Sequence, residues 1–281
     1  MKRLHVALVG LRFGESFIDI YRDHPFVESV ALYDVNTEKA KALTEKHGLR
    51  KYYSSFEALL ADDKVDAVHI ISPIPFHAEQ TIAVLNAGKH CACTVPMAQT
   101  LDEIYRIKEA VEQSGKNYMM METSVFFHQT LYVKDLYECG RLGNIQFMQG
   151  TYYQDFCGLG SYWQGLPPMM YATHAVGPLV ELAGCNIARI RSMGVGKMSR
   201  ELTESYGNPF PIECAMLEFE NGITGEVIRT MFETAKDCKE AFQVFGSEMS
   251  FEWGLRNTDR KAFITHMVET ASVPVEERGP Y

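Results

Sequence analysis

The turn "GLRFGESF", residues 10–17, is the first pattern in this sequence that could support chemistry. It follows the apolar run "LHVALV", so it leads from a strand into a helix, and Gly10 and Gly14 allow a tight turn and close helix packing. Backbone N–H groups at the start of such a helix bind phosphate. Arg12 stands where a middle glycine is expected, and its guanidinium either reaches a phosphate or points into solvent. By itself the turn is a weak indication of a dinucleotide site.

An aspartate and a two-proline loop strengthen that interpretation. Asp34 ends the second predicted strand about twenty residues after Gly14, where a carboxylate accepts hydrogen bonds from ribose hydroxyls. Its other interpretation is that it merely begins a turn before Asn36. A carboxylate here would repel a 2′-phosphate, so NAD is favoured over NADP. The loop "SPIPFH", residues 72–77, follows the third strand at the carboxyl edge of the sheet, where such folds bind ligands.

Two cysteines in "HCACTVPMAQT", residues 90–100, raise the question of a metal or thiol site. Cys91 and Cys93 are two residues apart on an apolar strand, so their side chains point the same way. A C-x-C pair offers too few ligands for zinc, and no His or Cys cluster elsewhere in the sequence is an obvious partner. We interpret the pair as core packing and expect no metal.

The composition narrows the class of protein. The 281 residues are enough for two domains, and 46% hydrophobic and 22% charged residues are typical of a globular protein. The net charge of -9 and the lack of basic runs argue against nucleic acid as a partner. No apolar stretch is long enough for a membrane helix. The start "MKRLHVALVG" runs directly into a strand, and the seven cysteines are scattered, so we expect a reduced, cytoplasmic location.

The first part of the chain alternates strand and helix patterns. Continuous apolar runs separated by helical segments predict parallel strands that helices cover on both faces. We therefore expect an α/β fold with a doubly wound Rossmann sheet over residues 1–121. The predicted strands are "LHVALVG", "VESVALYD", "VDAVHIIS", "HCACTV" and "NYMMM", and the predicted helices cover residues 15–22, 36–48 with Asn36 as N-cap and Gly48 as stop, 78–88 and 101–115.

After Glu122 the pattern changes to long alternating segments. Residues 131–143 predict a helix, and residues 213–233 predict a hairpin because Asn221-Gly222 is a strong signal for a two-residue turn. "EAFQVFGSEMSFEW" and "KAFITHMVE" continue the strand pattern. We expect residues 122–281 to form an α+β domain for substrate binding and oligomerisation, with a large, mostly antiparallel open sheet.

These features together resemble the Gfo/Idh/MocA family of NAD(P)-dependent oxidoreductases. The matching residues are "VALVGLRFG", Asp34, "SPIPFHAEQTIAVLNAGKH" with Pro73 and His77, the turn with Pro96, "CGRLGNI" and the region around His174. The resemblance covers essentially the whole chain and implies a Rossmann domain followed by an α/β domain with an open sheet. Members usually extend well beyond this sequence, so we expect that a segment after "EERGPY" is missing.

The chain departs from the family at a catalytic position. Many members carry Glu-Lys-Pro where this sequence has Thr94-Val95-Pro96, and their lysine is often assigned to catalysis. The aspartates common around the family histidine are also absent. The segments "TVPMA", "MMMETSVF", "GTYYQDF" and "PMMYATHAVGP" resemble the NAD-dependent glycosidase branch, which is known for α-N-acetylgalactosaminidase activity. Its enzymes oxidise a sugar at C3, lose the C2 proton and the aglycone, add water and reduce the ketone again.

The resemblance implies His174, Tyr171 and Tyr152 as catalytic residues, because His and Tyr can move protons when a site tunes their pKa values. His174 could instead be a buried structural histidine. Tyr152 and Tyr153 face opposite sides of a strand, so only one lines a site. Glu122 either contacts the nicotinamide ribose or anchors the domain junction. The residues expected to bind NAD are Gly10, Leu11, Arg12, Phe13, Gly14, Asp34, Ser72, Pro73, His77, Thr94, Val95, Pro96 and Glu122.

Three functions follow as hypotheses. The first is redox-assisted cleavage of a glycoside with bound NAD, and the second is simple oxidation of a sugar or polyol. The third is a sugar sensor that binds the dinucleotide without turnover, as a co-repressor of the family does. The expected partners are a small sugar or glycoside and further copies of the chain, since a broad exposed sheet face commonly needs a cover.

Overall fold

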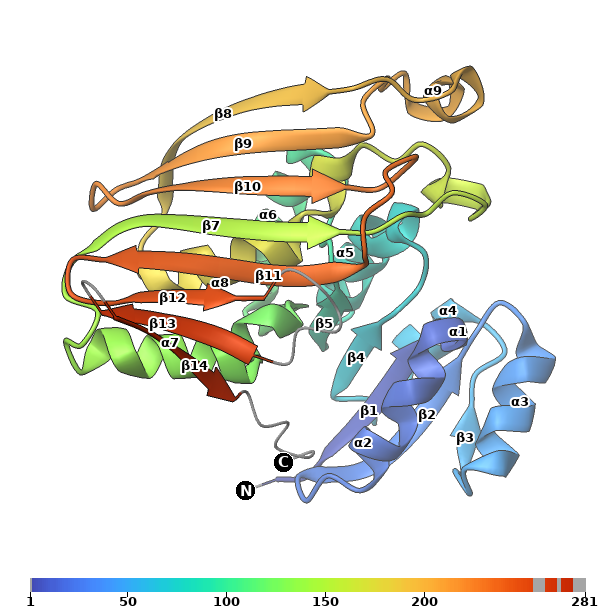
Figure 1. Cartoon of the computed structure of the whole chain (residues 1–281). Helices are drawn as coiled ribbons and strands as arrows, with labels where there is room; N and C mark the ends of the chain where they lie inside the picture. Colours follow the sequence, from blue (N-terminus) through green and yellow to red (C-terminus); the bar gives the residue numbers. More distant parts are fainter. Residues whose placement is uncertain (1, 255–260, 267–268, 275–281) are drawn as a thin grey trace. The chain divides into compact units, whose positions relative to one another are not determined.

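The computed structural model describes residues 2–254, 261–266 and 269–274, with side chains for residues 2–254. The chain divides into two compact units, Met1–Met121 and Glu122–Tyr281 (Figure 1). Residues 267 and 268 of the predicted strand "KAFITHMVE" and the ending "EERGPY" lie outside the described residues.

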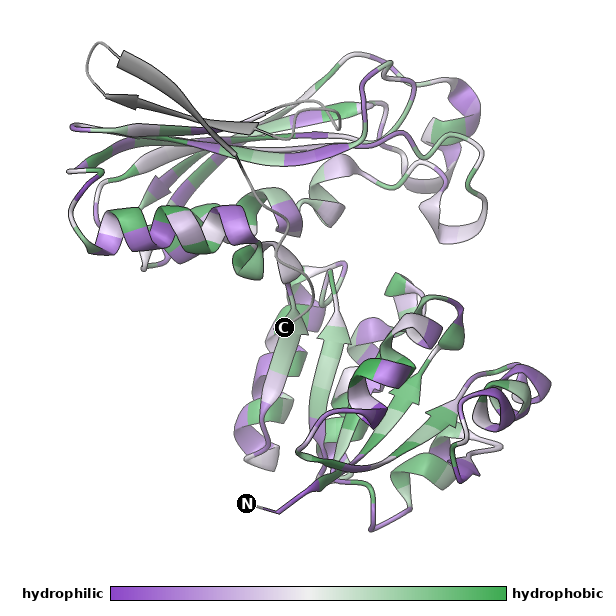
Figure 2. Cartoon of the chain, turned by 60° about the horizontal axis from the view of Figure 1, so that its bottom comes forward, coloured by the Kyte–Doolittle hydropathy of each residue, from purple (hydrophilic) through white to green (hydrophobic). Residues whose placement is uncertain are grey.

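The N-terminal unit contains a six-stranded sheet in the order β3-β2-β1-β4-β5-β6. All neighbouring strands run parallel, which confirms the doubly wound prediction. Its strands are β1 (Leu4–Val9), β2 (Val27–Tyr33), β3 (Lys51–Tyr52), β4 (Ala67–Ile70), β5 (His90–Thr94) and β6 (Tyr118–Met121). Figure 2 shows that these strands are predominantly hydrophobic, as expected of a sheet that is covered on both faces.

Helices cover both faces of this sheet. Val6 and Leu8 of β1 pack into one hydrophobic cluster with residues of α2 and α3, whereas Ala7 and Val9 pack into a second cluster with α5 and α6. Successive side chains of a strand point to opposite faces, so one strand serves both clusters. The helices are α1 (Leu11–Gly14), η1 (Glu15–Phe17), α2 (Ile18–Arg22), α3 (Thr37–Lys46), α4 (Phe56–Leu60), η2 (Ile74–Phe76), α5 (His77–Asn86) and α6 (Leu101–Ser114).

The helix ends follow local signals. The Asn36 side chain accepts a hydrogen bond from the Lys39 N–H at 3.0 Å, which confirms the predicted N-cap, and Gly48 with φ +65° follows the end of α3. The sequence analysis did not identify β3 and α4. β3 has two residues, too few for a periodic pattern, and α4 has five and begins at a Ser55 cap.

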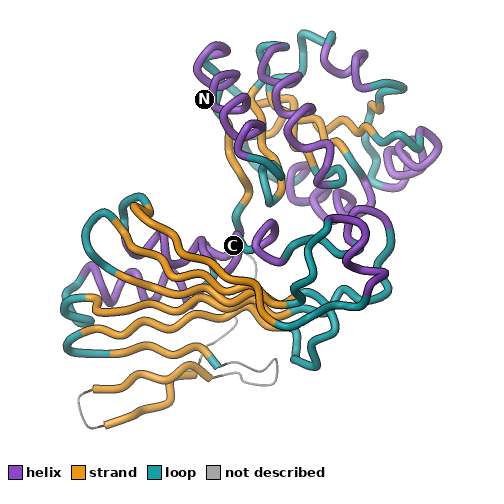
Figure 3. Tube along the Cα trace, turned by 90° about the horizontal axis from the view of Figure 1, so that it is seen from above, coloured by secondary structure: helices purple, strands orange, loops and turns teal. Residues whose placement is uncertain are grey.

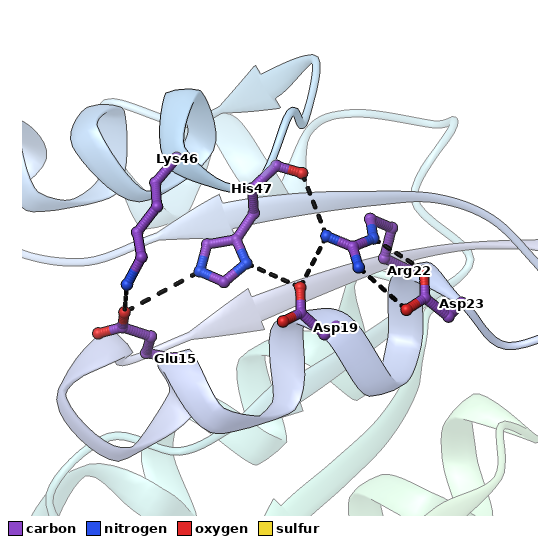
Figure 4. A network of polar contacts seen from close by, with 6 residues as sticks. All are labelled: Glu15, Asp19, Arg22, Asp23, Lys46 and His47. Carbon is purple, nitrogen blue, oxygen red and sulfur yellow. Dashed lines mark hydrogen bonds and ion pairs between the residues drawn. The ribbon is translucent and has the colours of Figure 1, made fainter.

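A network of charged side chains links α2 to the end of α3 (Figure 4). Lys46 bonds to Glu15 at 2.6 Å, and Nδ1 of His47 lies 2.8 Å from an Asp19 oxygen. Arg22 continues the network to Asp19 at 2.7 Å. Exposed ion pairs contribute only about 0–1 kcal/mol each, so the network orients the two helices more than it stabilises the unit.

The C-terminal unit contains an eight-stranded sheet in the order β14-β13-β12-β11-β7-β10-β9-β8. β7 and β10 run parallel and the other neighbours antiparallel, which confirms a large, mostly antiparallel sheet. Its strands are β7 (Ile145–Tyr153), β8 (Ile187–Val195), β9 (Ile212–Phe219), β10 (Thr224–Thr230), β11 (Lys239–Gly246), β12 (Ser250–Trp253), β13 (Lys261–His266) and β14 (Glu269–Pro274).

The long helices of this unit lie on one face of its sheet (Figures 2 and 3). Helix α8 approaches β7 closely at Gly150, where a Cβ atom would lie 2.0 Å from the carbonyl oxygen of Ala175. Only glycine fits there, and the contact fixes the start of α8 against the strand. The helices are η3 (Thr123–Phe126), α7 (His128–Glu138), η4 (Ser161–Trp163), η5 (Pro168–Tyr171), α8 (Thr173–Ala183) and α9 (Arg200–Tyr206).

The hairpin of β9 and β10 is present, but its turn is longer than the predicted two residues. The N–H of Gly222 donates to the Phe219 carbonyl at 2.9 Å, and the N–H of Phe219 donates to the Ile223 carbonyl at 2.9 Å. Gly222 has φ +86° and Asn221 does not have a positive φ, which is the pattern of a type I turn followed by a bulge. The Asn221 side chain instead donates to the Ala183 carbonyl at 2.9 Å, which ties the turn to the end of α8.

Candidate functional site

The glycine turn of the N-terminal unit has the shape that a dinucleotide needs. Gly10 has φ +89°, and a Cβ atom there would lie 2.6 Å from the backbone nitrogen of Ser72. A Cβ at Gly14 would lie 3.1 Å from the Ile71 side chain, so the helix start packs directly on the end of β4. Leu11 is buried, whereas Arg12 and Phe13 are exposed beside the turn. The two glycines thus allow the turn and the helix start to pack closely against the end of β4.

Asp34 performs a structural role at the carboxyl end of β2. Its Oδ2 accepts a hydrogen bond from the Leu11 N–H at 2.7 Å, and its Oδ1 accepts one from the Asn36 N–H at 2.8 Å. Asp34 therefore does begin the turn before Asn36 and stabilises it through these bonds. Each carboxylate oxygen can accept a further bond, so the ribose interpretation is compatible with the same geometry.

The loops after β4 and β5 are connected through His77. The buried imidazole lies between two carbonyl oxygens, with Nδ1 2.7 Å from Pro96 O and Nε2 2.7 Å from Ser72 O. Burial lowers the pKa of His77, although both carbonyl contacts act in the opposite direction. Because both ring nitrogens are engaged, His77 can position a cofactor through these loops but has no ring nitrogen to offer it.

The remaining predicted residues of this unit lie on the same two loops. Pro73 precedes the short helix η2, and the Ser72 hydroxyl donates to Gln80 at 2.5 Å. The Thr94 hydroxyl donates to the Ile70 carbonyl at 3.3 Å, and the Val95-Pro96 bond is cis. All the predicted cofactor residues of this unit thus lie at the carboxyl ends of β1, β2, β4 and β5.

A buried acid-base pair is found in the C-terminal unit. Oε1 of Glu122 lies 2.6 Å from Nδ1 of His174 and accepts the N–H of Ser124 at 2.9 Å. Burial raises the pKa of Glu122, but the hydrogen bonds and charge of its neighbours lower it by more, so the net shift is downward. An ionised carboxylate can only accept, so His174 donates through Nδ1. Its Nε2 is then the atom that can take up a proton.

Two phenols surround this histidine. The ring centroids of Tyr152 and Tyr171 lie 5.3 Å and 5.8 Å from that of His174. Burial raises the pKa of Tyr171 to about 12 and raises that of Tyr152 as well. Tyr153 lies on the opposite face of β7, 5.1 Å from the Lys236 amine. The structure therefore groups Tyr152, Tyr171, His174 and Glu122.

Strand register adds two residues that the sequence analysis missed. Arg229 of β10 and Glu240 of β11 both pair with Tyr152 of β7, which places the three side chains in a row on the face that α8 covers. They come from three strands that are far apart in the sequence, and no local spacing signals their proximity. A charged residue within a strand pattern was the only available sign.

Arg229 is a fully buried cation under the two phenols. Its guanidinium carbon lies 3.9 Å from the ring centroid of Tyr152 and 5.4 Å from that of Tyr171. It donates to the backbone carbonyls of Tyr171 at 2.8 Å and Tyr152 at 3.1 Å, and to the Gln154 side chain at 2.5 Å. Burial lowers its pKa to about 10, so the group stays charged at neutral pH. Arg229 thus holds both tyrosine segments and places positive charge beside the phenols.

The cysteine pair belongs to the core. Cys91 and Cys93 are buried, and burial raises the pKa of the Cys91 thiol to about 12, so neither geometry nor ionisation favours metal binding. Within the described part of the chain, His, Cys, Asp and Glu form no group of three or more that could hold a metal ion. Among the helices that the structure describes, none combines the length and apolar character required to cross a membrane.

Comparisons with known proteins agree with the Rossmann fold of the N-terminal unit. Residues 4–122 match the model of an oxidoreductase family with an NAD-binding Rossmann fold. "Glycosyl hydrolase family 109 protein 1" of Bacteroides thetaiotaomicron is 27% identical over 201 residues, which is 65% of this chain and 43% of the relative. The "4-carboxy-2-hydroxymuconate-6-semialdehyde dehydrogenase" of a Sphingobium species is 30% identical over 151 residues, 53% of this chain and 48% of the relative. The chain thus spans less than half of the length of these two curated relatives.

The fold extends over the whole chain. The crystal structure of "aldose-aldose oxidoreductase" from Caulobacter crescentus superimposes with a TM-score of 0.81, covering 100% of this chain and 85% of that one. Its sequence identity of 19% is low, so this likeness concerns the architecture of the two units alone.

Proposed function

We propose that the protein is an NAD-dependent oxidoreductase acting on a glycoside, because residues 4–122 match the model of the Gfo/Idh/MocA oxidoreductase family with an NAD-binding Rossmann fold. The reaction we propose is cleavage without net oxidation. A C3 hydroxyl becomes a ketone, the C2 proton and the aglycone leave, water adds at C1, and the ketone is reduced again. Relatives named as family 109 glycosyl hydrolases support this choice.

The N-terminal unit holds the cofactor in this proposal. The Gly10 turn receives the pyrophosphate, Asp34 accepts the ribose hydroxyls, and the loops at Pro73 and Pro96 line the nicotinamide end, with His77 holding these loops together. NAD, when bound, would accept a hydride from C3 while the C3 hydroxyl proton passes to solvent water, and it would return the hydride at the end. Asp34 carries negative charge where a 2′-phosphate would lie, so NAD is preferred over NADP.

The observation that carries the proposal is the Glu122–His174 pair with two phenols beside it in the C-terminal unit. Oxidation of an alcohol requires one base, whereas elimination also requires a base for the C2 proton and an acid for the leaving oxygen. Glu122 and His174 form the basic pair, with Nε2 as the proton acceptor. Tyr152 and Tyr171, beside the Arg229 charge, are hydroxyl groups that can hydrogen-bond the sugar. No lysine is needed for this chemistry, which agrees with Thr94-Val95-Pro96.

Plain dehydrogenation is the second candidate, because the Sphingobium relative is named a dehydrogenase. A homo-oligomer is part of the proposal, since the sheet exposes apolar side chains such as Met193 at 66% and Ile190 at 59%.

One experiment separates these functions. The protein is incubated with NAD and a panel of nitrophenyl α- and β-glycosides while nitrophenol release and NADH are followed together. Release without NADH accumulation is the expected result. NADH without release would instead indicate a sugar dehydrogenase. If neither nitrophenol nor NADH forms while calorimetry still shows NAD binding, the protein is a sensor, and this result would contradict an enzymatic role.

A further inference from the structure

Glu240 is a second carboxyl group beside the basic pair. It pairs directly with Tyr152 across β11 and β7. Its Oε2 is buried and has no hydrogen-bond partner. A buried polar atom without a partner is unfavourable, and a ligand with a suitable polar atom would satisfy it.

The same residue lines an open pocket within the C-terminal unit. The pocket has a volume of about 270 Å³ and combines aromatic walls with polar groups; it is lined by Phe127, Tyr152, Cys238, Lys239, Glu240 and Trp253. Phe127 and Trp253 contact each other edge to face, with centroids 6.0 Å apart. Aromatic surfaces with a few convergent polar groups are typical of small-molecule sites.

The surroundings of Glu240 differ from those of Glu122. Burial and the negative charge of Glu122 raise the pKa of Glu240, although His174, Tyr152 and Arg229 act to lower it. Glu122 has the opposite net shift. When two carboxyl groups of one site have pKa values shifted apart, the higher one is suited to donate a proton and the lower one to hold charge.

We propose that Glu240 is the proton donor of the site and that its carboxyl group protonates the glycosidic oxygen of a substrate seated against Tyr152 and Trp253. This assignment rests on the proposed glycoside cleavage. The chemical class of ligand is a glycoside whose leaving group is a poor one, such as an alcohol or another sugar. Burial raises the pKa of the Tyr152 phenol, so Tyr152 alone is too weak an acid for the same task.

The protons of the elimination and of the water addition are balanced within the site. The O–H bond of Glu240 breaks as its proton goes to the leaving oxygen, and the electron pair of the C1–O bond stays with that oxygen. The C2–H electron pair forms the C1–C2 double bond while His174 takes the proton. When water adds at C1, its proton returns Glu240 to the acid form, and His174 returns its proton to C2.

The test compares leaving groups. Glu240→Gln removes the acid but keeps the size of the side chain. With phenyl or methyl glycosides the expected loss of kcat/KM is about 10²–10⁴-fold, whereas a dinitrophenyl glycoside, which leaves without protonation, loses less than about tenfold. The matched control is Glu226→Gln, on the opposite face of β10, which leaves both rates unchanged. Equal losses on both substrates, or none, would overturn the assignment.

A second readout does not need turnover. Carboxyl carbon NMR of glutamate-labelled protein, with the Glu240→Gln spectrum used for assignment, gives the Glu240 titration directly. The expected pKa lies above the ordinary value of a glutamate, and an ordinary value overturns the donor role. The two proposals fail differently. If the wild-type protein cleaves no glycoside, both the proposed glycoside cleavage and the proposed role of Glu240 as proton donor are wrong. If wild type cleaves both substrates and the variant loses both equally, only the assignment of Glu240 falls.

Discussion

Replacing Glu122 by glutamine tests whether the His174 pair is a positioned base. Glu122→Gln keeps the shape of the side chain and removes its charge. In the native site Oε1 accepts from Nδ1 of His174 at 2.6 Å and from the Ser124 N–H at 2.9 Å. A glutamine amide can instead donate to Nδ1, which moves the imidazole proton to Nε2 and removes the proton acceptor.

The size of the effect follows from the lost charge. A hydrogen bond to a charged group contributes about 1.5–3 kcal/mol, and about 1.4 kcal/mol corresponds to a factor of ten. We therefore expect kcat to fall by about 10- to 150-fold, with a smaller change in KM. The native pKa of Glu122 is lower than its ordinary value of 4.5, so its contribution to stability is present above that value and is lost as the pH falls below it. The stability difference between wild type and Glu122→Gln should shrink in acid.

The assays are turnover of a nitrophenyl glycoside, nitrogen NMR of the His174 ring, and urea unfolding between pH 7 and pH 3. Glu181→Gln is the control, because Glu181 lies on the same helix α8, is half-exposed and pairs with Lys134. It should leave turnover and the ring tautomer unchanged. If Glu122→Gln retains wild-type turnover with Nδ1 still protonated, the reasoning about the basic pair is wrong.

Three further predictions concern the cofactor and the phenols. Gly10→Ala should weaken NAD binding by more than tenfold in calorimetry, because its Cβ would meet the Ser72 backbone. Gly48→Ala is the control, since Gly48 has φ +65° and no atom lies within 4 Å of the added Cβ. It should lower the free energy of unfolding by only about 1–2 kcal/mol and leave the affinity for NAD unchanged. Asp34→Ser should lower affinity for NAD and raise it for NADP, and an unchanged ratio of the two would contradict the ribose role. Tyr152→Phe should slow turnover about 10- to 100-fold, whereas Tyr153→Phe, on the other face of β7, should not; equal effects would remove Tyr152 from the site.

The N-terminal unit could be predicted because its signals are local. Each strand is an apolar run, and each helix beside it has its own cap or glycine stop, as at Asn36 and Gly48. β3 could not be predicted because a strand of two residues shows no hydrophobic periodicity. The Asn221-Gly222 signal predicted the hairpin but not the type of its turn. The Asn221 side chain donates to the Ala183 carbonyl, and this contact between distant residues cannot be predicted from the local sequence.

The candidate site of the C-terminal unit was only partly predictable, because its residues come from segments far apart in the sequence. Tyr152 and His174 were identified through a family resemblance, whereas Arg229 and Glu240 depend on which strands become neighbours of β7. That register is set by packing of the whole sheet. A charged residue in a strand can face solvent or the core, and the sequence alone does not distinguish the two.

The position of β7 dictates an order of folding. Both of its neighbours, β10 and β11, are synthesised long after it, whereas β1 finds its first partner, β2, soon after it. A ribosome-bound chain that ends before Lys239 can already hold a finished nucleotide domain, yet its tyrosine-bearing strand still has an open edge. Nascent strands in that condition are prone to aggregate, so chaperone capacity should limit the yield of this protein in cells.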